Sequence, residues 1–329
     1  NGDLDYWSEA LARSLTSVGI GKDDTMQVSY GYGLFTGGLG LHYGAERVGA
    51  TVLPSGTGST ERQIELMVDL GVTAIACTPS YLIHIGEVAE KMGIDIRRDT
   101  KLRKAVVGAE PWTESMRAHI ESSMGVKAYD IYGTSEMAGP MFTECEERKG
   151  IHMQSDMVYV EIIDPETGEV LEPGQKGEMV VTMLKKEAFP LVRYRIKDLT
   201  CLLNDECPCG RTSPRIERIK GRSDDMLIIR GINVFPSQVE HTLMQIPEVG
   251  NQYMIIVNRK GSLDEMIVQV ELKNEAFSDK MTDMMMLKSK IEAEMKKYLN
   301  IAVKVDLKEP ETLPRFEGKA KRVIDNRVL

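Results

Sequence analysis

Two hydroxyls and a carboxylate follow directly after an expected strand in the stretch AYDIYGTSEMAGP. The strand is expected over residues 128–132, and Gly133 ends it before Thr134, Ser135 and Glu136. Open α/β sheets bind their ligands at the carboxyl ends of strands. The hydroxyls can bond phosphate oxygens, and Glu136 offers the hard oxygen ligand that Mg²⁺ takes alongside nucleotide phosphates. A polar turn without a chemical role is the alternative.

Two further strand ends carry residue types suited to a nucleotide. In VVGAEPW, Gly108 and Ala109 let a flat ring approach the backbone, and Pro111 stiffens the turn after Glu110. In YRIKDLT, the carboxylate of Asp198 can bond ribose hydroxyls, as acidic residues do in dinucleotide sites. An ordinary strand-to-helix loop and a solvated aspartate are the alternatives.

A lysine near the end of the chain is suited to binding anions. In LPRFEGKAKRVID, Gly318 permits a turn in the loop that presents Lys319. An ammonium group on a flexible stem can bind both a carboxylate and an α-phosphate. A basic tail in contact with solvent is the alternative.

Cysteines and a histidine suggest a structural zinc site. The stretches ECEERKGIH and CPCGR contain the candidate ligands Cys145, His152, Cys207 and Cys209. Three thiolates and an imidazole form a usual closed zinc set. Cys201 is an outside candidate for this site, and Cys77 is expected in the core. Free thiols in surface loops, or a regulatory disulfide, remain as alternatives.

Composition narrows the class of protein. The chain has 329 residues, 42% of them apolar, and a net charge of -9, which argues against a nucleic-acid or anionic-membrane footprint. No apolar run reaches the length of a membrane span. Five cysteines, an odd number, favour a reducing compartment and hence the cytoplasm. The polar amino end lacks a signal peptide and an initiator methionine, so we expect the remainder of a longer protein.

Regular alternation of strands and helices is expected before residue 150. A first helix is predicted within residues 3–19. The later strands and helices are predicted, in chain order, over residues 26–30, 38–48, 50–54, 61–70, 72–78, 80–92, 102–108, 114–124 and 127–132. This alternation predicts an α/β fold, with a mostly parallel sheet covered by helices on both faces.

The character of the sequence changes twice after residue 150. Strand-like runs separated by Pro- and Gly-containing turns predict antiparallel sheet over residues 151–205. After GRSDD, a compact α+β module is expected, with Met284, Met285 and Met286 as core filler. We therefore expect a large domain over residues 1–222 and a small carboxyl-terminal lid domain over residues 223–329.

Together these motifs resemble the adenylate-forming superfamily of acyl-CoA synthetases and adenylation domains. The resembling stretches are SYGYGLFTGGLGLHYGAERVGATVLP, GAEPW, YDIYGTSEMAGP, RYRIKDLT, GRSDDMLIIRGINVFPSQVE and PRFEGKAKRVIDNR, which span nearly the whole chain. The first is specific to the branch that joins aryl acids such as phenylacetate to coenzyme A. The resemblance implies that a carboxylate attacks ATP to give acyl-AMP and pyrophosphate, and that the thiol of coenzyme A then displaces AMP.

The resemblance also implies residue roles. The nucleotide- and acid-binding set is Gly108, Ala109, Glu110, Pro111, Asp130, Tyr132, Gly133, Thr134, Asp198, Arg222 and Asp224. Glu136 would bind Mg²⁺, Asp198 the ribose, and Lys319 would serve adenylation together with Thr134. Lys321 is the weaker lysine candidate. The small domain of such enzymes rotates at the position of Asp224, which withdraws the lysine before the thiol reacts.

One family feature is missing from these residues. The superfamily has a Ser/Thr/Gly-rich loop with a lysine that holds the β- and γ-phosphates, and PSGTGSTER resembles it only in composition. We expect that loop and part of the aryl pocket to lie outside this chain. The alternatives are a free-standing adenylation enzyme that loads a carrier protein, and an inactive nucleotide-binding fragment. The oligomeric state is left open, a homodimer being the commonest form among soluble oligomers.

Overall fold

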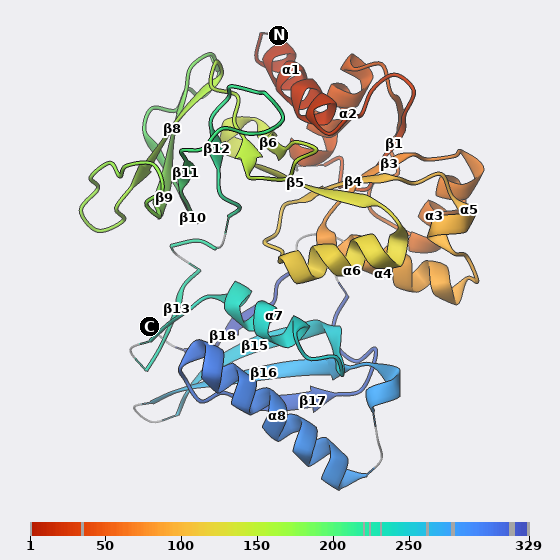
Figure 1. Ribbon diagram of the computed structural model, residues 1–329, viewed down its shortest axis with the longest axis vertical. Helices are drawn as coiled ribbons and strands as arrows, with labels where there is room; N and C mark the ends of the chain where they lie inside the picture. Colours follow the sequence, from red (N-terminus) through yellow and green to blue (C-terminus); the bar gives the residue numbers. More distant parts are fainter. Residues whose placement is uncertain are drawn as a thin grey trace. The chain divides into compact units, whose positions relative to one another are not determined.

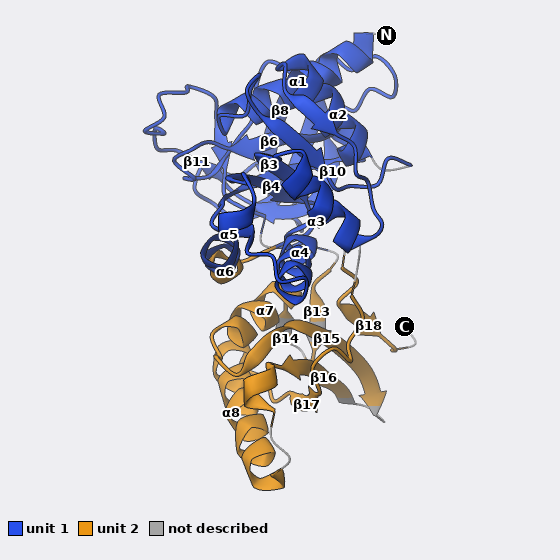
Figure 2. Cartoon of the chain, turned by 90° about the vertical axis from the view of Figure 1, so that its right-hand side faces the viewer, with its two compact units in different colours: residues 1–111, 117–223, 317–319 blue, residues 112–116, 224–316, 320–329 orange. Residues whose placement is uncertain are grey.

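The chain forms two compact units, shown in Figure 2. The computed structural model describes residues 2–33, 36–219, 221–223, 225–230, 232–260, 263–277, 280–315 and 320–327. Unit 1 comprises residues 1–111, 117–223 and 317–319, and unit 2 comprises residues 112–116, 224–316 and 320–329. The division into domains at residues 222 and 223 stays a proposal.

Five parallel strands form one half of a nine-stranded sheet in unit 1. In spatial order they are β2 (Thr51–Leu53), β1 (Thr25–Val28), β3 (Ala74–Cys77), β4 (Lys104–Gly108) and β5 (Lys127–Thr134). Their connections contain α2 (Thr36–Arg47), α3 (Thr60–Asp69), α4 (Pro79–Lys91), α5 (Ile96–Asp99) and α6 (Glu114–Met124). The central strand β3 is buried throughout, which fits a parallel strand covered on both faces. The predicted α/β class is confirmed.

Four short antiparallel strands complete the same sheet. They are β6 (Gly139–Glu144), β7 (Ile151–His152), β12 (Arg215–Ile216) and β11 (Leu202–Leu203). The expected end of a strand at Gly133 was wrong, because β5 continues to Thr134 and returns as a hairpin through the 3₁₀ turn η1 (Ser135–Met137) into β6.

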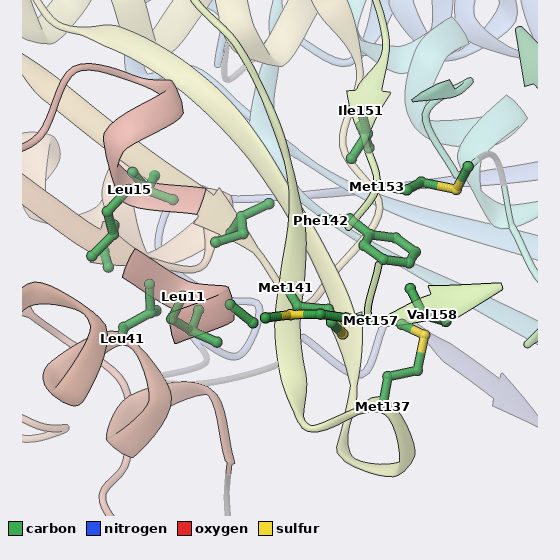
Figure 3. Close-up of a cluster of buried hydrophobic side chains, with 14 of the residues drawn as sticks. Leu11, Leu15, Leu41, Met137, Met141, Phe142, Ile151, Met153, Met157 and Val158 are labelled. Carbon is green, nitrogen blue, oxygen red and sulfur yellow. The ribbon is translucent and has the colours of Figure 1, made fainter. Parts of the chain in front are cut away.

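Glycines on α2 allow α1 (Gly2–Ser17) to pack closely against it. A Cβ on Gly40 would lie 2.5 Å from Nε1 of Trp7, and one on Gly44 would lie 2.6 Å from Cβ of Leu11. Figure 1 shows α1 and α2 on one side of the sheet and α4 on the other. Leu11, Leu15 and Leu41 join Met141 and Phe142 of β6 in the buried core shown in Figure 3.

A separate three-stranded antiparallel sheet follows, as expected from the turn-rich sequence. Its strands are β8 (Val158–Ile163), β9 (Gly177–Met183) and β10 (Tyr194–Thr200), with β9 in the middle. The register of β10 shifts between Arg195 and Leu199, and Lys197 within this bulge has a φ of 74°. The irregularity lies beside Asp198, one of the predicted nucleotide residues.

Unit 2 is an α+β module with its own core. A two-stranded pair, β13 (Leu227–Ile229) and β14 (Ile232–Val234), precedes a four-stranded sheet in the order β17-β16-β15-β18. The remaining elements are α7 (Pro236–Met244), β15 (Val249–Lys260), β16 (Leu263–Leu272), η2 (Asn274–Ala276), α8 (Met281–Leu299), β17 (Lys304–Lys308) and β18 (Val323–Asp325).

Helix α8 corrects one sequence expectation. Met285 and Met286 are 63% and 66% exposed, so they are not core residues, and only Met284 packs against the core. The buried stripe instead begins at Leu287 and continues at Ile291, at helical spacing. Among the described residues, no helix combines the length and apolar character needed to cross a membrane.

Candidate functional site

The hairpin between β5 and β6 contains residues 134–136, which we call the Thr-Ser-Glu corner. A Cβ on Gly133 would lie 1.9 Å from the carbonyl oxygen of Gly139, so only glycine fits at this close approach. Ala138 and Gly139 both have positive φ, which returns the chain sharply into β6. The turn leaves Ser135 exposed and Glu136 half-buried. A strand end of this shape can present hydroxyls and a carboxylate to a ligand.

The hydroxyl groups of the Thr-Ser-Glu corner, and a lysine beside it, are suited to binding an anion. Oγ1 of Thr134 is buried and has no hydrogen-bond partner among the described residues. A buried hydroxyl of this kind calls for an explanation, such as a bound group that it contacts. Oγ of Ser135 lies 3.4 Å from Oγ1 of Thr36 on α2. Nζ of Lys186, from the β9–β10 loop, donates to the carbonyl oxygen of Glu136 over 2.7 Å and places a positive charge beside the corner.

Three predicted nucleotide residues meet around one carboxylate. Oη of Tyr132 donates to Oδ2 of Asp198 over 2.5 Å. Nη1 of Arg222 donates to Oδ1 over 3.2 Å, and Asp198 and Arg222 also form an antiparallel backbone bridge. Burial and the Asp198 charge raise the pKa of Tyr132 well above its usual range, so the phenol remains a donor. A carboxylate held in this way is a suitable acceptor for ribose hydroxyls.

Asp130, within β5, belongs to a second ionic network. Its Oδ2 accepts from Nε of Arg218 over 2.7 Å, and its backbone N–H donates to Oε2 of Glu144. Arg117 forms a two-pronged ion pair with Glu144, with N–O distances of 2.8 Å and 2.9 Å. Burial raises the pKa of Glu144, and the Arg117 guanidinium opposes that shift. The network holds the strand that ends in the corner.

The end of β4 supplies the neighbouring loop. A Cβ on Gly108 would lie 2.1 Å from the carbonyl oxygen of Ile131, so glycine is required where β4 passes β5. Ala109 turns the chain with a φ of 69°, and Pro111 is exposed. Oε1 of Glu110 accepts from the N–H of Ser80 over 2.7 Å, at the start of α4. The carboxylate therefore caps a helix, and Oη of Tyr30 donates to the carbonyl oxygen of Gly108 over 3.3 Å.

Comparison with known proteins identifies the family. The "AMP-binding enzyme" family model matches residues 34–183, and the "AMP-binding enzyme C-terminal domain" model matches residues 231–327. The chain is 47% identical over 328 residues to the phenylacetate-coenzyme A ligase of Pseudomonas putida, covering 99% of this chain and 74% of that protein. It is 45% identical to the ligase of the same name from Aromatoleum evansii, with the same coverage. The chain belongs to the phenylacetate–coenzyme A ligases.

A solved structure agrees with this membership. A 2-hydroxyisobutyryl-CoA ligase, crystallised in the postadenylation state with R3-HIB-AMP, matches with a TM-score of 0.93 and 32% identity. The match covers 99% of this chain and 70% of that one. As a phenylacetate–coenzyme A ligase family member, the chain has the adenylate-forming fold expected from its motifs.

The four predicted zinc ligands also come together. Ligand atoms of Cys145, His152, Cys207 and Cys209 all lie within 4.8 Å of one another. Burial lowers the pKa of His152 to about 4, helped by Arg211 and Arg215, so its ring is neutral near pH 7. A neutral imidazole is the form that binds a metal.

The structure assembles most of the predicted residues, but not all of them can be placed. Lys319 and Asp224 lie outside the described residues. Sequence reasoning missed Lys186, because a lysine in a turn-rich loop carries no pattern of its own. It also missed Arg218, although RIERIKGR has a basic residue every few positions that could have drawn attention.

Proposed function

We propose that the chain catalyses the ATP-dependent ligation of phenylacetate, or a closely related aryl acid, to coenzyme A. One observation supports the proposal most directly: Tyr132, Asp198 and Arg222 of this chain form one hydrogen-bonded group. The chain is 47% identical to a phenylacetate-coenzyme A ligase. This group provides a ribose acceptor of the kind that an adenylate requires.

The reaction has two displacements. A carboxylate oxygen of the acid attacks the α-phosphorus of ATP, and the bond to pyrophosphate breaks. The sulfur of coenzyme A then attacks the acyl carbon, the bond to AMP breaks, and the thiol proton is released. In this proposal Thr134 and Ser135 bond phosphate oxygens, Asp198 orients the ribose, and Lys319 offsets the negative charge of the first step.

Two metal ions belong to the proposal. Glu136 would hold Mg²⁺, which neutralises phosphate charge when bound. Oγ1 of Thr134, buried and unpartnered among the described residues, fits a role in bonding a phosphate oxygen. The cluster of Cys145, His152, Cys207 and Cys209 would hold a structural Zn²⁺. A lid domain over residues 223–329 and a cytoplasmic location complete the proposal.

A coupled assay tests this function. The purified protein, with any residues that precede or follow this sequence, is given Mg²⁺, ATP and phenylacetate, and pyrophosphate release is measured; coenzyme A is then added, and phenylacetyl-CoA is measured by mass spectrometry. Both products are expected, and neither should form without the acid. Transfer to a phosphopantetheine carrier protein but not to coenzyme A would identify an adenylation enzyme instead. Calorimetric ATP binding without pyrophosphate release would identify a nucleotide-binding protein without ligase activity.

A further inference from the structure

The four candidate zinc ligands, which we call the cluster, are spaced like the ligands of a closed tetrahedral site. They are Cys145, His152, Cys207 and Cys209. Sγ of Cys145 and Sγ of Cys207 are 3.6 Å apart, and Sγ of Cys209 is 3.5 Å from Nε2 of His152. Zn–S bonds of about 2.3 Å and Zn–N bonds of about 2.0 Å in a tetrahedron separate their ligand atoms by roughly 3.5 to 3.8 Å. Cys145, His152 and Cys207 are buried, as structural ligands usually are.

A hydrogen bond outside the cluster orients the histidine. Nδ1 of His152 lies 2.9 Å from Oγ of Ser213, which turns Nε2 toward the three thiols. Metal-binding histidines commonly use their second nitrogen in this way, and the bond holds the orientation of the ring. Ser213 is therefore a positioning residue for the proposed ion.

The loop between β11 and β12 is held by few buried side chains other than its ligand of the cluster. Across residues 204–214, Cys207 is the one buried residue. A small thiol by itself buries little apolar surface, so hydrophobic packing contributes little to the order of this loop. A metal bond from Cys207 and Cys209 to Cys145 at the end of β6 and His152 on β7 would fix the loop to the sheet.

The loop leads directly into the nucleotide residues. We name residues 215–219 and 221–223 the strap; it begins at β12, where Arg215 pairs with the ligand His152. The strap then runs along β10: the N–H of Leu199 donates to the carbonyl oxygen of Gly221 over 2.9 Å, and the N–H of Ser223 to that of Lys197 over 2.7 Å.

Two arginines of the strap reach the carboxylates of the proposed site. Nε of Arg218 is 2.7 Å from Oδ2 of Asp130, and Nη1 of Arg222 is 3.2 Å from Oδ1 of Asp198. A shift of the strap would move both guanidiniums and leave the buried Asp130 and Asp198 without these partners. The strap thus begins beside the zinc ligand His152 and ends at Arg222, which contacts Asp198 of the proposed nucleotide site.

We propose that a zinc ion bound by Cys145, His152, Cys207 and Cys209 positions the strap, so that nucleotide affinity depends on metal occupancy. The proposal rests on the nucleotide site proposed above. It gives the cluster a role in substrate binding, in addition to stability.

Metal content and AMP affinity are measured on the same protein. Wild-type chain purified under reducing conditions is analysed for zinc by mass spectrometry, and AMP binding is measured by calorimetry before chelation, after chelation, and after Zn²⁺ is restored. We expect about one zinc per chain and an AMP dissociation constant that rises at least about fivefold without metal, the lower end of usual coupling between sites. Restored Zn²⁺ should recover the original value.

Three variants separate coupling from misfolding. Cys209→Ser should lose zinc and AMP affinity together. Ser213→Ala keeps all four ligands, and its zinc affinity should fall by roughly 10- to 100-fold, with AMP affinity restored at high Zn²⁺. Thr212→Ala, at the exposed position next to Ser213 in the same loop, is the matched control and should change neither.

The outcomes are distinct from failure of the proposed function. Absent zinc, a Cys145–Cys207 disulfide in the native protein, or unchanged AMP affinity after complete zinc removal would each overturn the inference while the ligase proposal stands. A zinc-loaded wild-type chain that binds no AMP would overturn both.

Discussion

Asp198 is the residue on which the nucleotide site depends. It is buried, it accepts from both Tyr132 and Arg222, and it lies beside a strained bulge residue, Lys197. Non-glycine residues with positive φ often accompany functional sites. The hydrogen bonds from Tyr132 and Arg222 fix the carboxylate in place, where it can accept from a ligand hydroxyl.

Replacing Asp198 by asparagine should weaken nucleotide binding. Asn keeps the size of the side chain but removes the charge and turns one acceptor into a donor. Hydrogen bonds to charged groups contribute about 1.5–3 kcal/mol, so the dissociation constant for AMP should rise roughly 10- to 100-fold by calorimetry. Asp69→Asn, at an exposed position at the end of α3, is the matched control. Equal affinity in Asp198→Asn and wild type would remove Asp198 from the site.

Tyr132→Phe tests whether the phenol acts through Asp198. The lost hydrogen bond should raise the dissociation constant for AMP by up to about tenfold, because a neutral donor contributes less than a charged group. In the double variant with Asp198→Asn, the two effects should not add, since residues in one network couple. Additive losses would mean that Tyr132 contacts the nucleotide on its own.

Helices and strands are predictable where their hydrophobic pattern extends over several residues. The strands of the parallel half carry apolar runs between helices, so the sequence predicts them. Strands β7, β11 and β12 are two residues each and have no detectable period. The hairpin at Gly133 was missed because the decisive feature is its approach to Gly139, a contact set by the three-dimensional fold. The cysteine and histidine cluster was predictable because residue type alone indicates metal chemistry.

Glu144→Gln should destabilise the hairpin. Its carboxylate is the ion-pair partner of the buried Arg117 on α6 and also accepts the N–H of Asp130 on β5. Removing one charge of a buried pair costs about 3 kcal/mol or more, because the other charge stays in a low-dielectric region. Urea unfolding should show this loss, whereas Glu147→Gln, three residues further on and exposed, should stay within about 0.5 kcal/mol of wild type. A loss of that small size in Glu144→Gln would show that the ion pair contributes no net stability.

At the scale of the whole molecule, the order of motifs identified the family before any single site did. The stretches from residues 128–140 and 314–327 belong to separate parts of the chain, and each by itself has an ordinary structural alternative. Their joint order, and the agreement over 99% of the chain with ligases of one name, exclude coincidence. Sequence reasoning could not provide the distances between side chains of distant segments, such as Arg218 and Asp130.

Lys319→Ala should separate the two half-reactions. If Lys319 offsets charge only while the acid attacks ATP, removing it should slow pyrophosphate release by about 10²- to 10³-fold, the usual effect of losing one such donor. Thioester formation from supplied phenylacetyl-AMP and coenzyme A should then stay near the wild-type rate, because the phosphoryl step is bypassed. Lys321→Ala, a lysine two positions away, is the matched control and should affect neither rate strongly. Stopped-flow measurement of both steps decides between the lysines. An equal loss of both steps in Lys319→Ala would assign the residue to binding of the adenylate, and a loss confined to Lys321→Ala would move the role to that side chain.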